Sequence, residues 1–535
     1  MRNLAKWAVA VGLWMGAFLT ASAQLPQCPL RPNPGSVVLD ALNLSSQNGA
    51  LSLDLTMRSS ADAFGFVHYC FDYMSSTGLI EAPTLRVNPG DTLTINFTNS
   101  LPIASAASNG HSMAHMQNMA DSSAIDPCNN KVMTASTTNI HFHGLNVPPV
   151  CHQDDVLNTL IQPSQTPFQY QVQIPANEPP GLYWYHPHPH GFTSTQVNGG
   201  AAGAIIVSGI EKVKPQVAGL TERVFFIRQQ TLPVAKEDTS AQLTLNFQPA
   251  TYPKSPSPII QMKPGEKQFW RVANASTKAF LSLAVFFGGT AQTLELISLD
   301  GVPVTGDPMQ TSINMPPAGR AEFIVTAPPS GTPATFVTRT FDTGPVGDPA
   351  PEQVLASIVT NSTATAQPAN LAGSTPPSTV TQRFSGLAAI KPTTTRKLYF
   401  AESPVGTNGP VDFFITVNGQ QPKLFTMDQP PSIVTKVGAV EDWTIENHTP
   451  EEHAFHIHQI HFLVTAINGV AVTNPTLQDT YQIPYWNGSG PYPNVTVRMD
   501  FRDPNIAGTF VYHCHILDHE DGGMMAKIQV VPSPF

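Results

Sequence analysis

Four His-x-His pairs are the residues of this chain best suited to chemistry. They are His141-Phe142-His143, His186-Pro187-His188, His456-Ile457-His458 and His513-Cys514-His515. Imidazole and thiolate ligands suit copper and zinc far better than they suit metals that prefer hard oxygen ligands. Eight histidines and a thiolate exceed the ligand set of one tetrahedral ion. The pairs therefore predict several metal ions close together, one of them bound through Cys514.

The segment around Cys514 predicts two linked metal sites. Successive side chains of a strand point to opposite faces, so Cys514 would face away from His513 and His515. Four residues provide two imidazoles, a thiolate and a weak thioether, the ligands of a blue-copper electron-transfer site: His453, Cys514, His519 and Met524. A zinc site is disfavoured because no Cys-x-x-Cys accompanies the motif.

A repeated pattern indicates three copies of one domain. Each copy begins with a glycine, continues with alternating apolar residues and ends with an asparagine, at Gly90 to Asn99, Gly265 to Asn274 and Gly438 to Asn447. Alternation predicts half-buried strands. The 51 prolines, 37 glycines and a charged share of only 12% favour short strands joined by turns. We predict an all-β protein of three cupredoxin-like domains, each a Greek-key β-sandwich or barrel.

The predicted domain boundaries follow this repeat. They are a signal peptide at 1–23, a first domain at 24–210, a second at 211–362, a linker at 363–390 and a third at 391–535. The first and third domains each carry two His-x-His pairs and the second carries none. We therefore expect a metal cluster between the first and third domains, with the second as a spacer.

The N-terminus has the plan of a secretory signal. Arg2 and Lys6 precede an apolar run at 7–19, and Ala21-Ser22-Ala23 offers a cleavage site. The run is shorter than the roughly 20 residues of a membrane span. We expect a periplasmic or secreted protein without a membrane span. A net charge of −10 without a basic run argues against a nucleic-acid partner.

Export predicts disulfides, because they persist in oxidising compartments. If Cys514 binds a metal, four cysteines remain, and four can pair in three ways. We expect up to two disulfides among Cys28, Cys70, Cys128 and Cys151, in a pairing that the sequence leaves open.

Together the motifs resemble those of a three-domain multicopper oxidase of the laccase type. We expect a bacterial member of that family. The match is carried by HFHG at 141–144, WYHPH at 184–188, HAFHIH at 453–458 and HCHILDHE at 513–520 with Met524 beyond it. It extends over almost the whole mature chain, and all twelve ligand positions of the family are filled. The resemblance implies a copper-dependent enzyme with four copper ions.

The resemblance also implies which residues bind each copper. The type 1 copper would take His453, Cys514, His519 and Met524. The type 2 copper would take His141 and His456. The type 3 pair would take His143, His186, His188, His458, His513 and His515. His190 and His461 lie near these motifs but outside the family pattern.

A reaction follows from the resemblance. A small reducing substrate would give single electrons to the type 1 copper through the edge of His453 or His519. The electrons would pass through Cys514 to the other coppers, where O₂ becomes two waters. The acids that supply protons would be Glu520 and either Asp154 or Asp155. The substrate would be a phenol or aromatic amine, or a metal ion such as Cu(I), and we expect a monomer.

Two alternatives remain open. The segment at 111–119 contains His111, Met113, His115, Met116 and Met119, and such ligands suit soft Cu(I). It predicts either a copper-gathering loop or a segment that packs its methionines. A rival function is a copper-sequestering or copper-tolerance protein with little turnover. The paired type 3 ligands argue against it, and the third repeat argues against a two-domain nitrite reductase.

Overall fold

Strands dominate the chain, and the predicted all-β fold is confirmed. The computed structural model describes residues 27–62, 65–103, 126–164, 166–231, 241–250, 256–306, 308–362, 383–404 and 411–533. The predicted signal peptide, the segment at 111–119 and most of the predicted linker lie outside the described residues. Within them the helices are short: α1 (Thr193–Asn198), α2 (Ile210–Val213), α3 (Leu517–Asp521), and the 3-10 turns η2 (Pro127–Asn129), η3 (Pro215–Val217), η4 (Leu387–Ala389) and η5 (Pro504–Ile506). No described helix is long and apolar enough to cross a membrane.

The first unit is a sandwich of two sheets. One sheet has the order β1 (Asn43–Ser45), β5 (Thr84–Val87), β10 (Gly203–Val207), β9 (Gly181–His186) and β7 (His141–His143). The other has the order β4 (Gly78–Glu81), β3 (Val67–Ser75), β2 (Ala50–Ala61), β6 (Thr92–Asn99) and β8 (Phe168–Gln173). Apolar side chains of both sheets, such as Leu93 and Ile205, form one core between them.

The second unit repeats this plan. One sheet has the order β13 (Gln248–Pro249), β12 (Ala241–Leu245), β11 (Thr221–Thr231), β15 (Lys267–Ala275), β22 (Arg320–Thr326), β18 (Leu294–Leu299) and β19 (Val302–Pro303), with β20 (Met309–Gln310) on β18. The other has the order β14 (Ile259–Met262), β24 (Gln353–Thr360), β23 (Ala334–Thr338), β16 (Leu281–Phe287) and β17 (Thr290–Ala291), with β21 (Ile313–Met315) on β16.

The third unit is again two sheets. One has the order β26 (Val411–Val417), β25 (Thr394–Pro404), β28 (Ala439–Asn447), β34 (Asn494–Phe501), β30 (Phe462–Ile467) and β31 (Val470–Ala471), with β32 (Leu477–Gln478) on β30. The other has the order β27 (Ile433–Lys436), β36 (Met525–Val531), β35 (Gly508–Cys514), β29 (His453–Ile457) and β33 (Thr480–Ile483).

The repeated sequence pattern occupies the same place in each unit. Its copies are β6, β15 and β28, each flanked by strands on both sides. The glycines before them, Gly90, Gly265 and Gly438, have φ values of 91, 71 and 94°. Glycine adopts such positive φ values without steric cost. The asparagine of each copy lies at or next to the end of its strand and is buried, and Asn99 donates to two loop carbonyls at 2.8 and 2.7 Å. The repeat therefore specifies a turn, a strand and a loop anchor.

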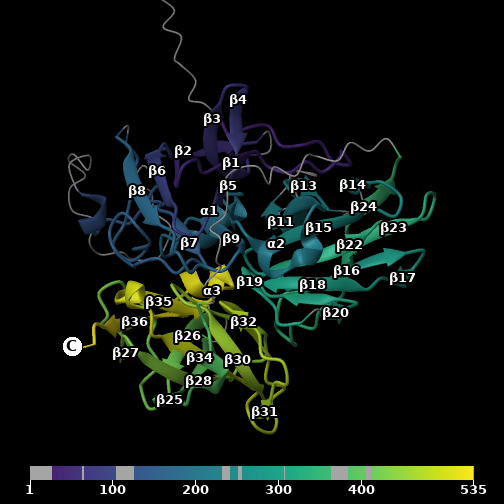
Figure 1. The fold of residues 1–535 in the computed structure, drawn as a ribbon. Helices are drawn as coiled ribbons and strands as arrows, with labels where there is room; N and C mark the ends of the chain where they lie inside the picture. Colours follow the sequence, from purple (N-terminus) through teal and green to yellow (C-terminus); the bar gives the residue numbers. More distant parts are fainter. Residues whose placement is uncertain are drawn as a thin grey trace, which may run out of the picture.

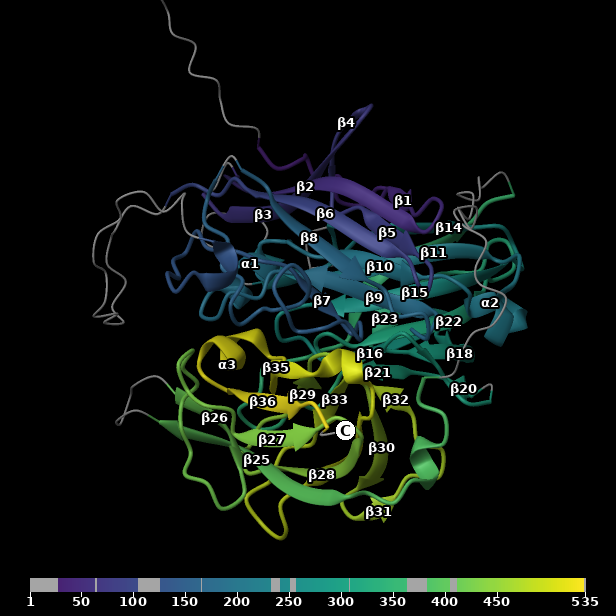
Figure 2. The ribbon, with the colours of Figure 1, turned by 60° about the vertical axis from the view of Figure 1, so that its left-hand side comes forward.

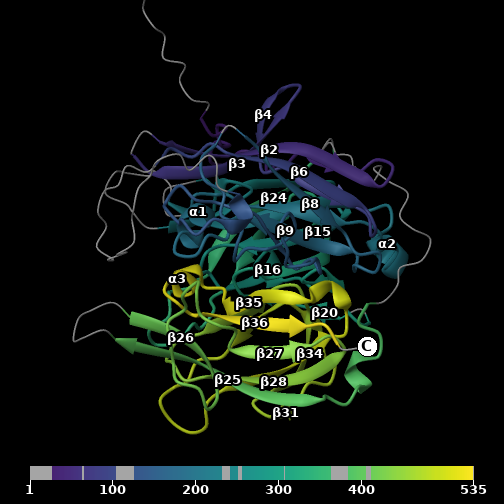
Figure 3. The same ribbon diagram turned by 90° about the vertical axis from the view of Figure 1, so that its left-hand side faces the viewer.

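The three units are packed against one another. Figure 1 shows the first unit in purple to blue and the second in teal, with the third, in green to yellow, below both. Figures 2 and 3 show the third unit below the others from two further sides. At the boundary, α3 meets α1, where Asp521 accepts hydrogen bonds from the N–H groups of Gly191 and Ser194 at 2.8 and 2.9 Å. The third unit is thus fixed to the first beside the His513-Cys514-His515 segment.

Two disulfides lie in the first unit. They join Cys28 to Cys70 and Cys128 to Cys151, which selects one of the three pairings that the sequence allows. Cys514 is a buried free cysteine.

Candidate metal centre

The four His-x-His pairs lie on or at the ends of strands that pair two by two. In the first unit β7 pairs with β9 and sets His141 opposite His186. In the third unit β29 pairs with β35 and sets His456 opposite His513. The two units meet at these strands, so that the ring of His141 stacks on that of His458, with centroids 3.8 Å apart. Local strand pairing and unit packing together gather the eight histidines.

The eight histidines form overlapping groups of three. Within each group, one ligand atom per residue lies within 4.8 Å of the others: His143, His186 and His515; His188, His458 and His513; and His141, His143 and His456. All eight are buried. Each group takes residues from both the first and the third unit, so neither unit builds one alone.

Ring nitrogens inside this cluster have the character of metal ligands. Several have no hydrogen-bond partner among the described residues: Nε2 of His141, His186 and His456, Nδ1 of His143 and His458, and both nitrogens of His515. Two further Nε2 atoms, of His188 and His458, approach Nε2 of His513 at 3.4 and 3.3 Å. Buried polar atoms normally have partners. Converging imidazole lone pairs without partners fit copper.

Other ring nitrogens of the cluster face oxygen acceptors. His141 Nδ1 lies 3.0 Å from Asp154 Oδ1, and His456 Nδ1 lies 2.8 Å from the carbonyl oxygen of Asp479. His143 Nε2 lies 3.2 Å from the Oδ1 of Asp479. The Nδ1 atoms of two others contact the carbonyl of the next residue at 2.9 Å: His186 and His513. Metal-binding histidines usually donate their second N–H in this way, which orients the ring.

Burial keeps these imidazoles neutral. It lowers the pKa of His186 to about 3 and that of His456 to about 4. Burial first, and neighbouring histidines or Arg320 second, also lower the pKa well below its usual range in the rest of the cluster: His141, His143, His188, His458, His513 and His515. Neutral imidazole is the form that binds metals.

A smaller group lies on the other side of the His513-Cys514-His515 segment. Cys514 Sγ is 3.5 Å from His453 Nδ1 and 3.9 Å from His519 Nδ1. The two Nδ1 atoms are 3.3 Å apart. Met524 is fully buried, and its carbonyl accepts a hydrogen bond from the Cys514 N–H at 3.0 Å. Two imidazoles and a thiol therefore converge as the strand alternation predicts.

Two glutamates face the outer nitrogens of this smaller group. Glu402 Oε1 lies 3.3 Å from His453 Nε2, and Glu451 Oε1 lies 3.2 Å from His519 Nε2. Thr449 Oγ1 is also 2.8 Å from His453 Nε2. The side chain of His519 is 9% exposed and that of His453 is 0% exposed. His519 is therefore the ring whose edge reaches solvent.

The two aspartates left open by the sequence lie in different surroundings. Asp154 is buried, contacts His141 and accepts a hydrogen bond from the Phe142 N–H at 2.9 Å. Burial raises the pKa of Asp154 well above its usual range. Asp155 instead accepts hydrogen bonds from the main chain and side chain of Asn158 at 3.1 and 3.0 Å. Asp154 is the aspartate of this pair whose carboxylate lies beside a clustered histidine.

Glu520, the third predicted acid, also lies against the cluster. Its Oε2 is 3.2 Å from His513 Nδ1 and its Oε1 is 3.5 Å from His188 Nε2. Burial, reinforced by Asp521, raises the pKa of Glu520 well above its usual range. Glu520 and Asp154 thus place two carboxyl groups beside different histidines of the cluster.

Sequence reasoning missed a buried charged group beside the histidines. Arg320 of β22 donates to both carboxylate oxygens of Asp479, at 2.7 Å to Oδ1. Asp300 Oδ2 accepts hydrogen bonds from the main-chain N–H groups of Asp479 and Thr480 at 3.2 and 3.3 Å. Although none of the clustered histidines belongs to the second unit, Arg320 and Asp300 do. The second unit therefore takes part in building the site and is more than a spacer.

Three other residues near the motifs have contacts of their own. His461 Nε2 lies 2.7 Å from the carbonyl oxygen of Asp300. The ring of His190 packs edge-on against Phe425, with centroids 5.0 Å apart. Gln459, with a φ of 60°, donates its side-chain amide to Asp154. Gln459 thereby ties the third unit to the carboxylate beside His141.

Three family models match the chain, and all describe multicopper oxidases. They match residues 119–212, 223–362 and 403–534, and together they extend over most of the chain. A multicopper oxidase from Staphylococcus aureus is 22% identical over 466 residues, which are 85% of this chain and 83% of that protein. A laccase from Bacillus subtilis is 23% identical over 496 residues, covering 85% of this chain and 89% of that protein.

Solved structures share the fold. A variant of a multicopper oxidase from Aquifex aeolicus matches with a TM-score of 0.66 and 18% identity, over 93% of this chain and all of that one. A Campylobacter jejuni multicopper oxidase, described as a metallo-oxidase, matches with a TM-score of 0.65 and 22% identity, over 94% of this chain and 96% of that one. The predicted cupredoxin-like fold is therefore confirmed.

Proposed function

Because this chain belongs to the multicopper oxidases, copper-dependent oxidoreductases that use O₂, we propose that it oxidises a small substrate one electron at a time and reduces O₂ to two waters. The observation that carries this proposal is the segment His513-Cys514-His515. It joins the group at Cys514 to the eight-histidine cluster. Copper bound at both groups would supply the one-electron steps and the four-electron reduction of O₂.

We propose four copper ions with the ligands that the resemblance implies. The type 1 ligands are His453, Cys514, His519 and Met524; the type 2 ligands are His141 and His456; the type 3 ligands are His143, His186, His188, His458, His513 and His515. Three groups with converging ligand atoms support this assignment: His143 with His186 and His515, His188 with His458 and His513, and His453 with Cys514 and His519.

Substrate electrons enter at His519 in this proposal. Its side chain is the more exposed of the two imidazoles beside Cys514. The ring of Phe413 stacks on it, with centroids 4.1 Å apart. Cys514 continues through its own main chain into His513 and His515, which provides a short covalent path for electrons toward the cluster.

The protons for water formation would be held on Asp154 and Glu520. Burial raises the pKa of both carboxyl groups, so each favours its protonated form. Asp154 contacts His141 and Glu520 contacts His513. The two acids would therefore release protons close to where O₂ is reduced.

The surroundings of His519 favour phenols and aromatic amines as substrates. A carboxyl group exchanges hydrogen bonds with O–H and N–H groups, and Glu451 lies 3.2 Å from the His519 edge, where burial and the neighbouring Glu402 raise its pKa to about 9. Phe413 offers an aromatic surface at the same place. Carboxylates are hard ligands that suit Cu(I) poorly. Oxidation of Cu(I) remains the alternative, and it would depend on the segment at 111–119.

Replacing Cys514 by serine tests the proposed activity. The thiolate would be both the source of blue colour and the exit for electrons. The variant should lose the intense visible band and nearly all oxidase activity, yet keep copper at the eight-histidine cluster. A variant that stays blue and active would contradict the assignment of Cys514 as a copper ligand. If the copper-loaded parent consumes no O₂ with either substrate class, the rival function, copper sequestration, gains support.

Replacing Glu451 by glutamine tests the proposed substrate class. Loss of the carboxyl group should raise KM for a phenol or aromatic amine several-fold and leave kcat nearly unchanged. The matched control is Asp428→Asn, which makes the same change from acid to amide at an exposed residue of the same unit. Equal KM and kcat values in parent and variant would show that Glu451 does not take part in substrate binding. Rapid Cu(I) oxidation with little phenol oxidation would favour the alternative substrate.

We also propose export to the periplasm or the medium as a monomer. The two disulfides support export, because such bonds persist in oxidising compartments. Fractionation of cells, followed by N-terminal sequencing of the mature protein, would locate it and identify the cleavage site. Recovery of the protein from the cytoplasm with residues 1–23 still attached would contradict this part of the proposal.

A further inference from the structure

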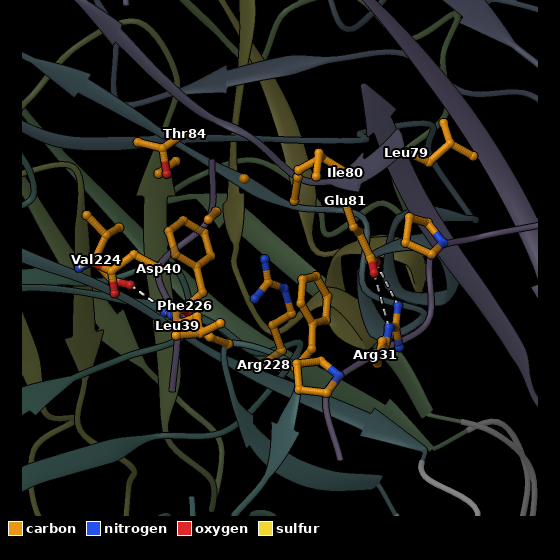
Figure 4. Close-up of a pocket in the computed structure, with 18 of the residues that line it drawn as sticks. Arg31, Leu39, Asp40, Leu79, Ile80, Glu81, Thr84, Val224, Phe226 and Arg228 are labelled. Carbon is orange, nitrogen blue, oxygen red and sulfur yellow. Dashed lines mark hydrogen bonds and ion pairs between the residues drawn. The ribbon is translucent and has the colours of Figure 1, made fainter. Parts of the chain in front are cut away.

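A cavity lies between the first and second units, apart from the metal centre. Its volume is about 240 Å³. Its walls come from residues 29–32, β4 and β10 of the first unit and from β11 and residues 246–247 of the second (Figure 4). In Figures 1 to 3, β4 lies on the side of the first unit that is turned away from the third unit. The cavity therefore does not belong to the metal centre or to the surroundings of His519.

The alternation of side chains along β11 explains why one wall of the cavity is mostly apolar. Phe225 and Ile227 point into the core of the second unit. Val224 and Phe226 point the other way and pack against the first unit. Arg228 follows on that same face, and Figure 4 shows its guanidinium inside the cavity. A charged side chain is thus placed where the strand pattern otherwise brings apolar residues.

The guanidinium of Arg228 is buried without a carboxylate partner. The residue is 3% exposed. Its Nη2 donates to the carbonyl of Ala202 at 2.7 Å, but its Nε has no partner among the described residues. The guanidinium lies over the ring of Phe247, 3.9 Å from the centroid. Cation–π contact and one carbonyl hydrogen bond do not neutralise a buried charge, which is costly without a counter-ion.

The other charges around the cavity are balanced. Arg31 pairs with Glu81 at 2.9 Å, and Asp40 pairs with Arg223 at 3.1 Å. Arg228 therefore leaves one positive charge in excess. The remaining lining is mainly apolar, and at the cavity Leu30 and Leu39 are 101% and 60% exposed. A single negative charge on an apolar body would satisfy both features.

We propose that this cavity binds a small aromatic carboxylate. The carboxylate would pair with the guanidinium of Arg228 through a charge-assisted hydrogen bond, which guanidinium geometry favours. The ring would pack against Phe226 and Phe247 and cover Leu39. Aromatic rings suit these walls because offset and edge contacts between rings are attractive. An inorganic anion would match the charge but would leave the apolar walls uncovered.

Isothermal titration calorimetry of the copper-loaded protein with benzoate tests the proposal. Benzoate should bind once per chain. Benzyl alcohol, which lacks the charge, and inorganic phosphate, which lacks the ring, should each bind about tenfold more weakly or worse. Arg228→Gln should weaken benzoate binding to a similar extent. The matched control is Arg498→Gln, which removes an arginine that is paired with Asp442 on the third unit. Equal binding of phosphate, or an unchanged affinity in Arg228→Gln, overturns the proposal.

Two further measurements keep the test decisive if Arg228→Gln does not fold. Leu39→Trp should block the cavity from its exposed side and weaken benzoate binding while leaving Arg228 in place. Crystals soaked with 4-iodobenzoate should show the anomalous signal of iodine inside the cavity. A signal found only elsewhere, such as beside His519, or no signal at all, contradicts the proposal.

Discussion

The guanidinium of Arg320 forms a two-point ion pair with the carboxylate of Asp479, across the boundary between the second and third units. Both side chains are fully buried. Asp479 in turn contacts His143 through Oδ1 at 3.2 Å and His456 through its carbonyl at 2.8 Å. An arginine of the unit without clustered histidines therefore helps to orient one imidazole from each of the other two units.

Replacing Arg320 by lysine should disturb this arrangement. Lysine is a point charge and cannot make two parallel hydrogen bonds to a carboxylate. We expect the bound copper to fall from four ions toward three, with a weaker or altered type 2 electron paramagnetic resonance signal. The blue type 1 band should stay unchanged, because Cys514 does not contact this pair. Copper analysis and spectroscopy on the same sample would measure both effects.

A matched control is available in the same unit. Arg271 is also a buried arginine of the second unit, and it pairs with Glu222 and Glu322. Arg271→Lys should cost a similar amount of stability without changing the copper signals. If Arg320→Lys also keeps four coppers and the parent spectrum, the Arg320–Asp479 pair contributes only to folding.

The sequence predicted those parts of the site that are encoded locally. Each His-x-His pair lies within three residues, and strand alternation alone separates Cys514 from His513 and His515. The Gly-to-Asn repeat likewise marks a turn, a strand and a loop anchor within ten residues. These features could be read without knowing how the units pack.

The Arg320–Asp479 pair could not be predicted in the same way. Arg320 and Asp479 are 159 residues apart in the chain. Arg320 is the first residue of β22, and Asp479 lies in a short link between β32 and β33. No local pattern distinguishes them from solvated charges. The choice between Asp154 and Asp155 also depended on packing, because only the fold shows which carboxylate turns toward His141.

Asp154→Asn and Glu520→Gln should each slow the reoxidation of the reduced enzyme by O₂. Each change removes a group that can give up a proton beside the cluster. We expect a loss of roughly 10²-fold or more, within the 10²–10⁴-fold span that general acids contribute. Reduction of the type 1 copper by substrate should stay close to the parent rate. Stopped-flow absorbance separates the two half-reactions.

Asp155→Asn is the matched control for this prediction. It makes the same chemical change at the neighbouring position, where the carboxylate contacts Asn158. Its reoxidation should match that of the parent. Slow reoxidation in Asp155→Asn together with normal reoxidation in Asp154→Asn would reverse the choice between the two aspartates.

Met524→Leu should raise the reduction potential of the type 1 copper while the site stays blue. A weak axial thioether tunes that potential, and leucine fills a similar volume without a donor atom. The matched control is Met525→Leu, since Met525 is a neighbouring buried methionine that packs in a different apolar cluster. A redox titration in which Met524→Leu and Met525→Leu both keep the parent potential would make Met524 a packing residue only.

Asp72 should make the stability of the protein depend on pH. Its side chain is buried, and neither carboxylate oxygen has a hydrogen-bond partner among the described residues. Burial, with Glu81 nearby, raises the pKa of Asp72 to about 7, although Arg58 at 3.2 Å opposes the shift. Between about pH 4 and pH 7 the folded protein therefore keeps a proton that the unfolded chain has lost. The free energy of unfolding must then fall as the pH rises through this range.

Asp72→Asn isolates this effect, because asparagine resembles the protonated acid and does not titrate. Parent and variant should be about equally stable near pH 4. By pH 8 the variant should be more stable by an amount on the order of 2–4 kcal/mol, since each pKa unit corresponds to about 1.4 kcal/mol. Scanning calorimetry at several pH values would measure the difference, with Asp54→Asn on the exposed face of β2 as the control. A difference between parent and Asp72→Asn that does not change with pH would show that Asp72 is ionised in the folded protein.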